Sequence, residues 1–230
     1  MRPRGVIRGF LDALFPRECH LCGNILSGET LFICETCRAA LPRTNYHRLP
    51  GNAMEQRFMG RFPYQRAAGH FFYSRDSDIA RLIHDFKYHN FPGLAREFGR
   101  FVGQEIAITP FFDGVDIIVP VPLHWKRIIK RGYNQSLEIA KGLSEAVGLP
   151  VVQSLQAVHN HRTQTSMSRS SRIDNIEGVF HVGGSDLSGK GVLIVDDVCT
   201  TGATLAEAAI TITRKYPSCK VSLLTIGVTF

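Results

Sequence analysis

The sequence lacks long apolar runs, low-complexity tracts and any internal repeat beyond two short cysteine pairs. No stretch approaches the roughly 20 apolar residues that a membrane-spanning helix needs. The first 15 residues combine scattered arginines with Asp12, and no small-residue cleavage site follows, unlike in a signal peptide. We therefore expect no membrane span and a cytoplasmic location. The 230 residues are 44% hydrophobic and 20% charged, which is typical of one substantial globular domain with a small appendage.

Acidic residues are also in short supply. The chain has 27 Lys and Arg against 20 Asp and Glu, for a net charge of +7 and a pI of about 9.3. This excess favours anionic ligands, either phosphate compounds or nucleic acid, but charge alone does not choose between them. A solvated basic surface without a specific partner remains the alternative.

The chain has six cysteines, and four of them form two Cys-x-x-Cys pairs: Cys19, Cys22, Cys34 and Cys37. Two such pairs on a short loop are typical of a tetrahedral zinc site, and Gly23 can take the positive φ that the first turn requires. Disulfides are disfavoured in a chain without export signals, and a redox dithiol needs only one pair. We predict a structural zinc, because four thiolates leave no coordination position for water.

Beyond residue 61 the apolar pattern alternates between strand-like and helical periods. The expected strands are residues 67–73, 115–119, 151–158, 191–195 and 220–228, and the expected helices cover 79–86, 94–106, 137–147 and a segment from Ala203. This alternation predicts an α/β fold with a doubly wound, mostly parallel sheet, whose ligands lie at the carboxyl ends of the strands.

The N-terminal part reads differently from this α/β pattern. Residues 1–45 hold too little apolar material to form a core without metal, and residues 42–61 have weak periodicity around Leu49-Pro50-Gly51-Asn52. We therefore divide the chain into residues 1–60, a zinc module with its linker, and residues 61–230, the α/β domain.

The most informative segment is the apolar strand that leads into Asp196 and Asp197 and then into a Thr/Gly loop. The loop residues are Thr200, Thr201, Gly202, Ala203 and Thr204. A loop of this kind before a helix offers backbone N–H and hydroxyl groups to a phosphate, and adjacent carboxylates suit ribose hydroxyls or a Mg²⁺-bridged ligand. An ordinary buried strand ending in an exposed turn is the alternative. The pattern resembles the 5-phosphoribosyl-1-pyrophosphate (PRPP) motif of type I phosphoribosyltransferases, with the loop on the 5-phosphate and the acidic pair as catalytic residues.

A second loop, residues 119–135, follows an expected strand and carries five donors for phosphate oxygens. They are His124, Lys126, Arg127, Lys130 and Arg131. A pyrophosphate needs several such donors, and arginine can engage it bidentately. We predict pyrophosphate contacts from Pro122, Leu123, Arg127 and Arg131. The alternative is a basic surface helix with Ile128 and Ile129 packed inward.

A third polar, basic loop, residues 159–172, adds Arg162 to the predicted pyrophosphate contacts. A mobile loop that closes over pyrophosphate would exclude water from the reacting centre, and a disordered surface loop is the alternative. Lys87, at the end of an expected helix, fits a cation that complements the helix dipole.

The order of these motifs resembles the ComF family over nearly the whole chain. The matching segments are the cysteine pairs, Phe86-Lys87-Tyr88, Pro120-Val121-Pro122-Leu123, Arg131-Gly132-Tyr133-Asn134-Gln135, Arg162-Thr163-Gln164, and the acidic pair with its Thr/Gly loop. The resemblance implies a type I phosphoribosyltransferase fold with a small N-terminal zinc ribbon. It also implies PRPP with Mg²⁺ as ligand, and a role in natural competence beside a helicase-like partner.

The resemblance leaves open whether the chain transfers a phosphoribosyl group at all. The alternative is a non-catalytic adaptor for single-stranded DNA, or a PRPP sensor that uses the same fold. Aromatic residues and arginines interleave over residues 57–66, a composition that can stack bases and hold phosphates. Core and strand-edge aromatics explain the same segment equally well.

Overall fold

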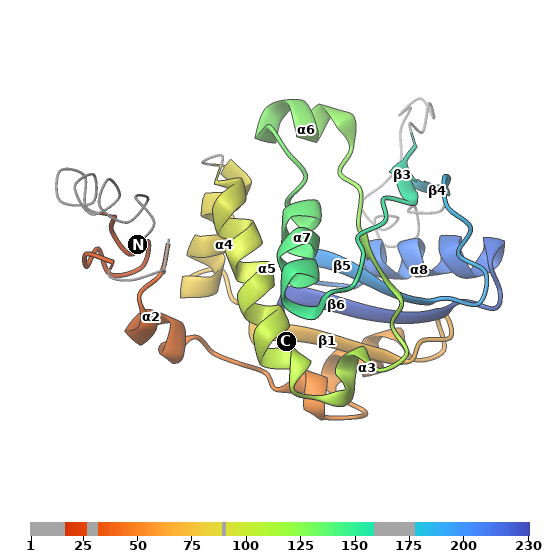
Figure 1. The fold of residues 1–230 in the computed structure, drawn as a ribbon, viewed down its shortest axis with the longest axis horizontal. Helices are drawn as coiled ribbons and strands as arrows, with labels where there is room; N and C mark the ends of the chain where they lie inside the picture. Colours follow the sequence, from red (N-terminus) through yellow and green to blue (C-terminus); the bar gives the residue numbers. More distant parts are fainter. Residues whose placement is uncertain (1–16, 27–31, 89–90, 159–177) are drawn as a thin grey trace, which may run out of the picture.

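A computed structural model describes residues 17–26, 32–88, 91–158 and 178–230 (Figure 1). Its centre is a four-stranded parallel sheet in the order β1-β6-β5-β2. The strands are β1 Arg66–Phe72, β2 Ile117–Pro120, β5 Gly191–Cys199 and β6 Lys220–Val228. A separate antiparallel pair joins β3 Leu155–Ala157 to β4 Phe180–Val182.

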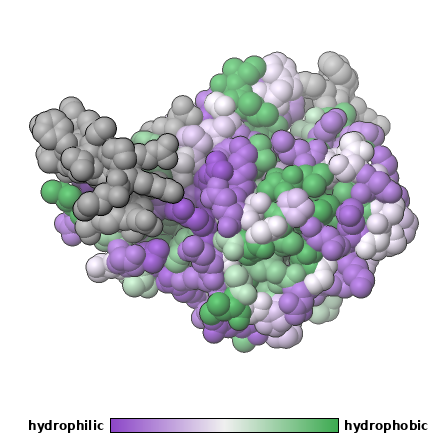
Figure 2. All heavy atoms as spheres, viewed as in Figure 1, coloured by the Kyte–Doolittle hydropathy of each residue, from purple (hydrophilic) through white to green (hydrophobic). Residues whose placement is uncertain are grey.

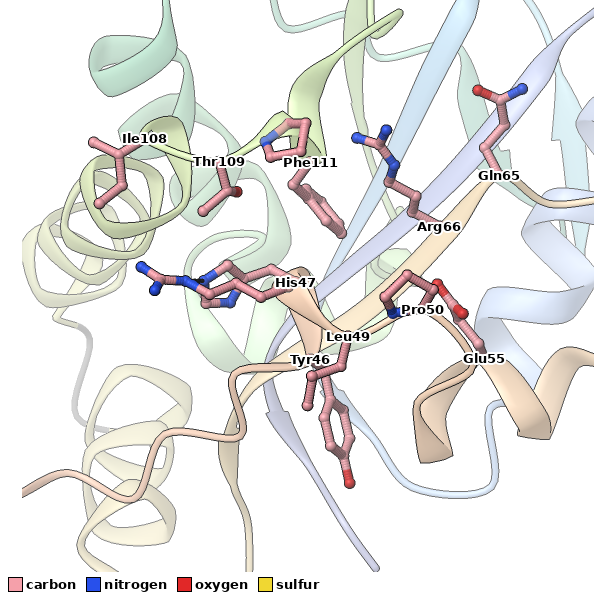
Figure 3. Close-up of a pocket in the computed structure, with 12 residues that line it drawn as sticks. Tyr46, His47, Leu49, Pro50, Glu55, Gln65, Arg66, Ile108, Thr109 and Phe111 are labelled. Atoms are coloured by element: carbon pink, nitrogen blue, oxygen red, sulfur yellow. Dashed lines mark hydrogen bonds between the residues drawn. The ribbon is translucent and has the colours of Figure 1, made fainter.

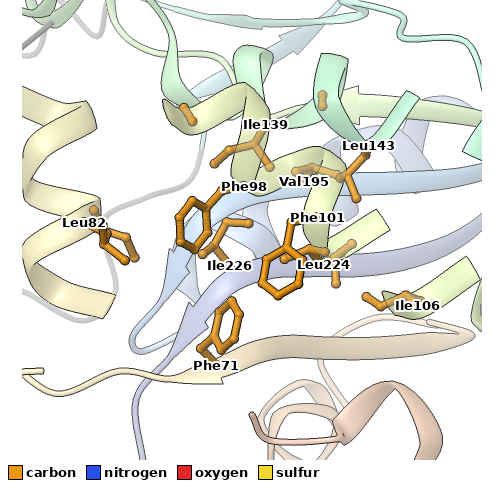
Figure 4. Close-up of a cluster of buried hydrophobic side chains, with 14 of the residues drawn as sticks. Phe71, Leu82, Phe98, Phe101, Ile106, Ile139, Leu143, Val195, Leu224 and Ile226 are labelled. Atoms are coloured by element: carbon orange, nitrogen blue, oxygen red, sulfur yellow. The ribbon is translucent and has the colours of Figure 1, made fainter. Parts of the chain in front are cut away.

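Helices cover both faces of the sheet, as the doubly wound prediction requires. The helices are α2 Glu35–Ala40, α3 Ala53–Phe58, α4 Asp78–Tyr88, α5 Pro92–Ala107, α6 Trp125–Arg131, α7 Gln135–Val147 and α8 Ala203–Lys215, with 3-10 turns η1 Tyr46–Arg48 and η2 Pro110–Phe112. One core packs α4, α5 and α7 on the sheet through side chains such as Leu82, Phe98 and Ile139 (Figure 4). The other packs α3 and α8 on the opposite face. The predicted α/β fold is confirmed.

Helices α5 and α7 cross at very short range, which fixes α7 against the sheet. A Cβ added to Gly99 would lie 2.1 Å from the carbonyl oxygen of Ile139, and one added to Gly142 would lie 1.9 Å from that of Arg96. No side chain fits at either point, so the two glycines allow the backbones of α5 and α7 to approach this closely. The crossing holds Ser136, at the start of α7, beside the carboxyl end of β5.

Two expected strands differ from the structure. Strand β5 continues through the acidic pair to Cys199 instead of ending at Val195. In the segment 151–158, Val151 makes only an isolated bridge to Ile118, and the strand itself is β3, outside the main sheet. The reason lies in β2, which is short and ends at Pro120, a residue without an N–H to continue the ladder.

The expected linker is folded on the sheet. Within residues 42–61, Met54 and Phe58 of α3 are fully buried. Asn52 caps α3 by accepting from two backbone N–H groups, and its side-chain amide donates to the carbonyl oxygen of Ala67 in β1. The local sequence has weak periodicity because α3 has only six residues. None of the described helices is long and apolar enough to cross a membrane.

A buried polar cluster lies where η1 meets β1. His47 stacks on His70 with ring centroids 5.5 Å apart, and His70 contacts Glu105 with Nε2 2.7 Å from Oε2. Arg43 donates to both oxygens of Glu105. Burial, together with the charges of His70 and Arg48, lowers the pKa of His47 to about 4. Burial alone would raise the pKa of Glu105, but the hydrogen bonds from His70 and Arg43 lower it to about 2.

We expect His47 to destabilise the fold as pH falls from 7 to 5. Its folded pKa is below its ordinary value of 6.5, so the unfolded chain takes up the proton first and stability is lost through this range. Glu105 contributes only below about pH 4.5. The loss in unfolding free energy between pH 7 and pH 5 should be smaller in His47→Gln by roughly 2 kcal/mol. Urea denaturation of both proteins measures it, and equal losses would contradict the assignment.

Candidate functional site

The predicted phosphate loop joins β5 to α8 at the carboxyl edge of the sheet. Gly202 takes φ 77° just before the helix and has no side chain to cap it, and the nearest side-chain acceptor is Thr201 Oγ1, 3.4 Å from the backbone nitrogen of Ala203. A small hollow of about 30 Å³ lies here, lined by Asp196, Val198, Cys199 and residues 200–205. Backbone N–H groups at the start of a 13-residue helix whose N-cap residue is glycine form a favourable position for an anion.

Helix α3 contacts this loop and restricts its conformation. Phe58 lies directly under Gly202, where an added Cβ would be 2.8 Å from the phenyl ring. Arg57 donates to the backbone carbonyl oxygens of Thr200 and Thr229, which ties the loop to the end of the sheet. The phosphate loop is therefore held by a segment that the sequence presented as a linker.

A methyl group at Gly202 should be more harmful than one at an equivalent exposed glycine. We expect Gly202→Ala to lower the unfolding free energy by about 2–3 kcal/mol, since it combines a positive φ with a clash against Phe58. Gly184 is the matched control: its φ is also 77°, but an added Cβ would meet nothing within 4 Å. Gly184→Ala should cost about 1 kcal/mol. Similar losses for both variants in urea denaturation would show that Phe58 does not restrict the loop.

The two carboxylates on β5 have different partners. Asp196 accepts hydrogen bonds from the Ser136 hydroxyl at 2.7 Å and from the backbone N–H of Asp197 at 2.9 Å. Asp197 pairs with Lys87 of α4, with Nζ 2.9 Å from the carboxylate and both side chains mostly buried. The acidic pair is thus held from α7 on one side and from α4 on the other.

Burial raises the pKa of Asp196 to about 7, and the negative charge of Asp197 adds to the shift. The hydrogen bond from Ser136 and the positive charge of Lys87 oppose it. Two close, buried carboxylates are costly to ionise together unless a cation or hydroxyl donors join them. A strongly shifted carboxyl group at the carboxyl edge of a parallel sheet is typical of a functional site.

Four of the five predicted pyrophosphate residues, Pro122, Leu123, Arg127 and Arg131, lie between β2 and α7. The backbone N–H of Val121 donates to Val195 at 2.9 Å, which places the segment with Pro122 and Leu123 beside β5. Arg131 donates to Gln135 at 3.0 Å, and its guanidinium lies 5.4 Å from the ring centroid of Tyr88, next to Lys87.

Helix α6 itself stands away from the sheet (Figure 1), and apolar atoms gather at its position on the surface (Figure 2). Ile129 is 74% exposed and Ile128 39% exposed, so the inward packing considered for these residues is not found. Arg127 is exposed on α6. Arg162 lies outside the described residues.

Three residues of the site have no role in the sequence prediction: Ser136, Lys87 as a partner of Asp197, and Arg57. Ser136 directly follows the motif Arg131–Gln135, and Lys87 lies within the motif Phe86–Tyr88. The sequence therefore marked both positions but not the side chains that they contact. Arg57 acts only on backbone carbonyl groups, which no sequence pattern reveals.

A cavity of about 660 Å³ lies between α4 and the cysteine-bearing segment, and Lys87, the partner of Asp197, is part of its lining. The lining also includes Tyr73, His84, Arg81 and His20. His20 contacts Asp85 of α4 with its Nδ1 3.1 Å from the carboxylate and packs edge-on against Phe91, so the N-terminal segment forms one wall. This cavity is large enough for a small organic molecule or one nucleotide.

The four N-terminal cysteines form one cluster, with their sulfur atoms within 4.8 Å of one another. The Sγ atoms of Cys22 and Cys34 are 3.7 Å apart, close to the roughly 3.8 Å edge of a tetrahedron with Zn–S near 2.3 Å. Backbone N–H groups of Cys34 and Cys37 donate to the sulfurs of Cys19 and Cys34 at 3.4 Å. The donor set, spacing and N–H···S bonds fit a structural zinc site, in agreement with the prediction.

Comparison with known families and proteins agrees with this architecture. The family model described as "Phosphoribosyl transferase domain" matches residues 133–226, which include the acidic pair and the phosphate loop. The model described as "Double zinc ribbon domain" matches residues 10–48. The chain has only four cysteines in that segment, enough for one site.

Curated relatives cover most or part of the chain. The "DNA utilization protein YhgH" of Salmonella typhi is 31% identical over 209 residues, or 84% of this chain and 89% of the relative. "Competence protein F" of Haemophilus influenzae is 30% identical over 135 residues, covering 56% and 59%. "Competence protein ComFC" of Bacillus subtilis is 29% identical over 110 residues, covering 48% and 43%.

Solved structures similar to this chain include a glutamine phosphoribosylpyrophosphate (PRPP) amidotransferase from B. subtilis. The TM-score is 0.39 at 20% identity, over 61% of this chain and 30% of that one. The chain thus spans under a third of that enzyme, and likeness at this level carries no argument about activity.

Proposed function

The chain belongs to the ComF family, and on that premise we propose that it is a PRPP-binding, phosphoribosyltransferase-like protein that acts in the handling of DNA during competence. The observation that supports this ligand is that two adjacent carboxylates, the buried Asp197 and the half-buried Asp196, lie beside the N-terminus of α8, whose N-cap residue is glycine. A phosphate on the helix terminus and a sugar diol on the carboxylates together describe a ribose 5-phosphate.

Each group has a proposed role. Thr200, Thr201, Gly202, Ala203 and Thr204 hold the 5-phosphate, while Pro122, Leu123, Arg127, Arg131 and Arg162 hold the pyrophosphate. Asp196 and Asp197 accept hydrogen bonds from the ribose hydroxyls. Oxygen donors of this kind, together with substrate oxygens, suit Mg²⁺, which would offset the negative charge of the pyrophosphate when bound.

If transfer occurs, the bond between the anomeric carbon and pyrophosphate breaks, and the pyrophosphate leaves with the electron pair. An acceptor nucleophile forms the new bond from the opposite face of the ring. Positive charge on the sugar is greatest between these events, and the carboxylates lie near it, while the basic residues stabilise the departing pyrophosphate. The cavity between α4 and the cysteine cluster is the proposed acceptor position, because Lys87 borders both sites.

Pyrophosphate release from PRPP in the presence of Mg²⁺ tests this proposal. The assay is run alone, with each nucleobase, and with single-stranded DNA, and PRPP binding is measured in parallel by calorimetry. Release that depends on an acceptor identifies a transferase, and binding without release identifies a sensor. Absence of binding would contradict the proposal as a whole.

A second candidate activity is binding of single-stranded DNA through α6. Trp125 is 47% exposed with the Lys126 ammonium 5.6 Å from its ring centroid, and Arg127 and Lys130 are exposed on the same helix. Exposed aromatic and basic side chains together can stack bases and hold the phosphate backbone. The helix also carries the proposed pyrophosphate residues, so DNA and PRPP should compete at least partly.

We expect binding of an oligothymidine by this surface to depend steeply on salt, with log K falling by about 0.7 for each phosphate neutralised. Lys126→Gln with Lys130→Gln should weaken binding at least fivefold and reduce the salt slope. The control pair is Lys190→Gln with Lys220→Gln, two exposed lysines at the amino edge of the sheet, which should change neither. Fluorescence anisotropy measures both quantities, and equal losses in the two pairs would place the DNA elsewhere.

A further inference from the structure

A second large cavity lies at the amino end of β1, on the edge of the sheet opposite the phosphate loop (Figure 3). Its volume is about 680 Å³, similar to that of many small-molecule sites. It is bordered by η1 and the turn after it, by α3, by the start of β1, and by the segment from the end of α5 into η2. The mouth is apolar: Leu49 is 51% exposed and Ile108 is 79% exposed.

Two residues lining this cavity hold buried nitrogen atoms without hydrogen-bond partners. They are Nδ1 of His47 and Nη1 of Arg66. His47 is only 9% exposed, and its Nε2 lies 3.2 Å from the Nε–H of Arg48. Since Nε2 accepts this hydrogen bond, the neutral ring carries its proton on Nδ1, so both unpaired atoms are donors.

A buried donor without a partner costs about 1–3 kcal/mol, and two around one cavity indicate that an acceptor normally joins them. Figure 3 shows His47, Arg66 and Phe111 coming from three separate elements to lie around the same space. Phe111 is fully buried and adds an aromatic surface. The two donors favour a ligand with an anionic acceptor group, and the aromatic and aliphatic lining favours a ligand whose remaining part is apolar.

One acidic residue, Glu55, also lines the cavity but does not neutralise the arginines. Its two carboxylate oxygens accept from the backbone N–H groups of Gly51 at 2.6 Å and of Ala67 at 3.3 Å. Both oxygens are thus engaged by backbone donors, and the single negative charge of Glu55 is outweighed by the two positive charges of Arg48 and Arg66.

The cavity shares α3 with the phosphate loop. Glu55, near the start of this six-residue helix, borders the cavity, while Arg57 and Phe58 at its end hold Thr200 and Gly202. A ligand that shifts or stiffens α3 therefore acts on the loop directly.

We propose that this cavity is an effector site for a small organic anion with an apolar body, such as an aromatic carboxylate or an aryl phosphate. Occupancy stiffens α3 and so the phosphate loop. The binding part is independent of the proposed PRPP function, and only the meaning of the loop response rests on it.

The binding test uses ¹⁹F NMR with 4-(trifluoromethyl)benzoate and its neutral amide as probes. The benzoate should bind at least tenfold more tightly than the amide, because its carboxylate offers two charged acceptor oxygens, whereas the amide offers one neutral acceptor and two unneeded donors. 4-(Trifluoromethyl)phenyl phosphate, as a third probe, distinguishes a phosphate from a carboxylate preference. Equal affinity for the benzoate and the amide would overturn the proposal.

Variants locate the probe. Arg66→Gln should weaken benzoate binding at least tenfold, whereas Arg61→Gln, an exposed arginine outside the cavity, should not. Since Arg66 is half-buried, a second pair guards against misfolding: Leu49→Glu at the exposed mouth should repel the anion, and Leu49→Lys should retain it. Unchanged binding in both Arg66→Gln and Leu49→Glu would place the probe outside this cavity.

Amide hydrogen exchange tests the coupling without any phosphoribosyl ligand. Saturating benzoate should slow exchange in residues 199–205 at least twofold in the wild type, but not in Arg66→Gln at the same probe concentration. Unchanged exchange of the loop in the saturated wild type would overturn the effector role. Failure of the separate PRPP binding assay would leave this result standing.

Discussion

Replacing both carboxylates, Asp196→Asn together with Asp197→Asn, should reduce PRPP affinity at least a hundredfold while the protein stays folded. The change removes both acceptors for the ribose hydroxyls and the two negative charges that suit Mg²⁺. A charge-assisted hydrogen bond contributes about 1.5–3 kcal/mol, so two lost together exceed the 2.7 kcal/mol of a hundredfold change. Calorimetry with PRPP and Mg²⁺ measures the affinity, and circular dichroism checks the fold.

The matched control is Asp113→Asn with Asp186→Asn, two exposed carboxylates that precede β2 and β5 at the amino edge of the sheet. This pair removes the same charge and should leave PRPP affinity within about twofold, since exposed charges at that distance are screened. Wild-type affinity in the Asp196/Asp197 double variant would refute the site. An equal loss in the control pair would mean that net charge, and not the carboxylate position, governs binding.

The local chemistry of the site could be predicted because it is carried by neighbours in sequence. The acidic pair and the Thr/Gly loop lie within nine residues, and the cysteines within two short pairs, so spacing alone placed them. The β5–α8 junction follows from one apolar run and one glycine with positive φ.

Contacts between distant segments could not be predicted in the same way. Lys87 pairs with Asp197 only because α4 and β5 end at the same edge of the sheet, and the sequence shows Lys87 as an ordinary helix-end cation. The role of Phe58 under Gly202 is set by the fold, since a six-residue helix has too few turns to show a period. Likewise, β3 leaves the main sheet because of where Pro120 ends β2.

Removing one ligand of the zinc site should change zinc binding as strongly as the double aspartate variant changes PRPP binding. Cys34→Ser should lower zinc content from about one equivalent to less than 0.1 in protein dialysed against a mild chelator. Cys34 acts three times in the cluster: it supplies a thiolate, its backbone N–H donates to Cys19, and its sulfur accepts from Cys37 at the start of α2. Structural zinc contributes about 10–16 kcal/mol of apparent binding energy, so losing one of four ligands, or about a quarter of it, should weaken binding roughly a hundredfold to a thousandfold.

Cys219→Ser provides the control for this loss, because Cys219 is a buried cysteine outside the cluster whose thiol donates to the Leu187 carbonyl at 2.7 Å. A serine hydroxyl can make the same hydrogen bond, so zinc content should stay at about one equivalent. Atomic emission measures the metal, and limited trypsin digestion follows the fold. In Cys34→Ser, the first cuts should fall within residues 17–48, where Leu26, Ile33 and Leu41 lose the packing that the cluster organises. Normal zinc content together with an uncut N-terminal segment in Cys34→Ser would exclude a four-cysteine site.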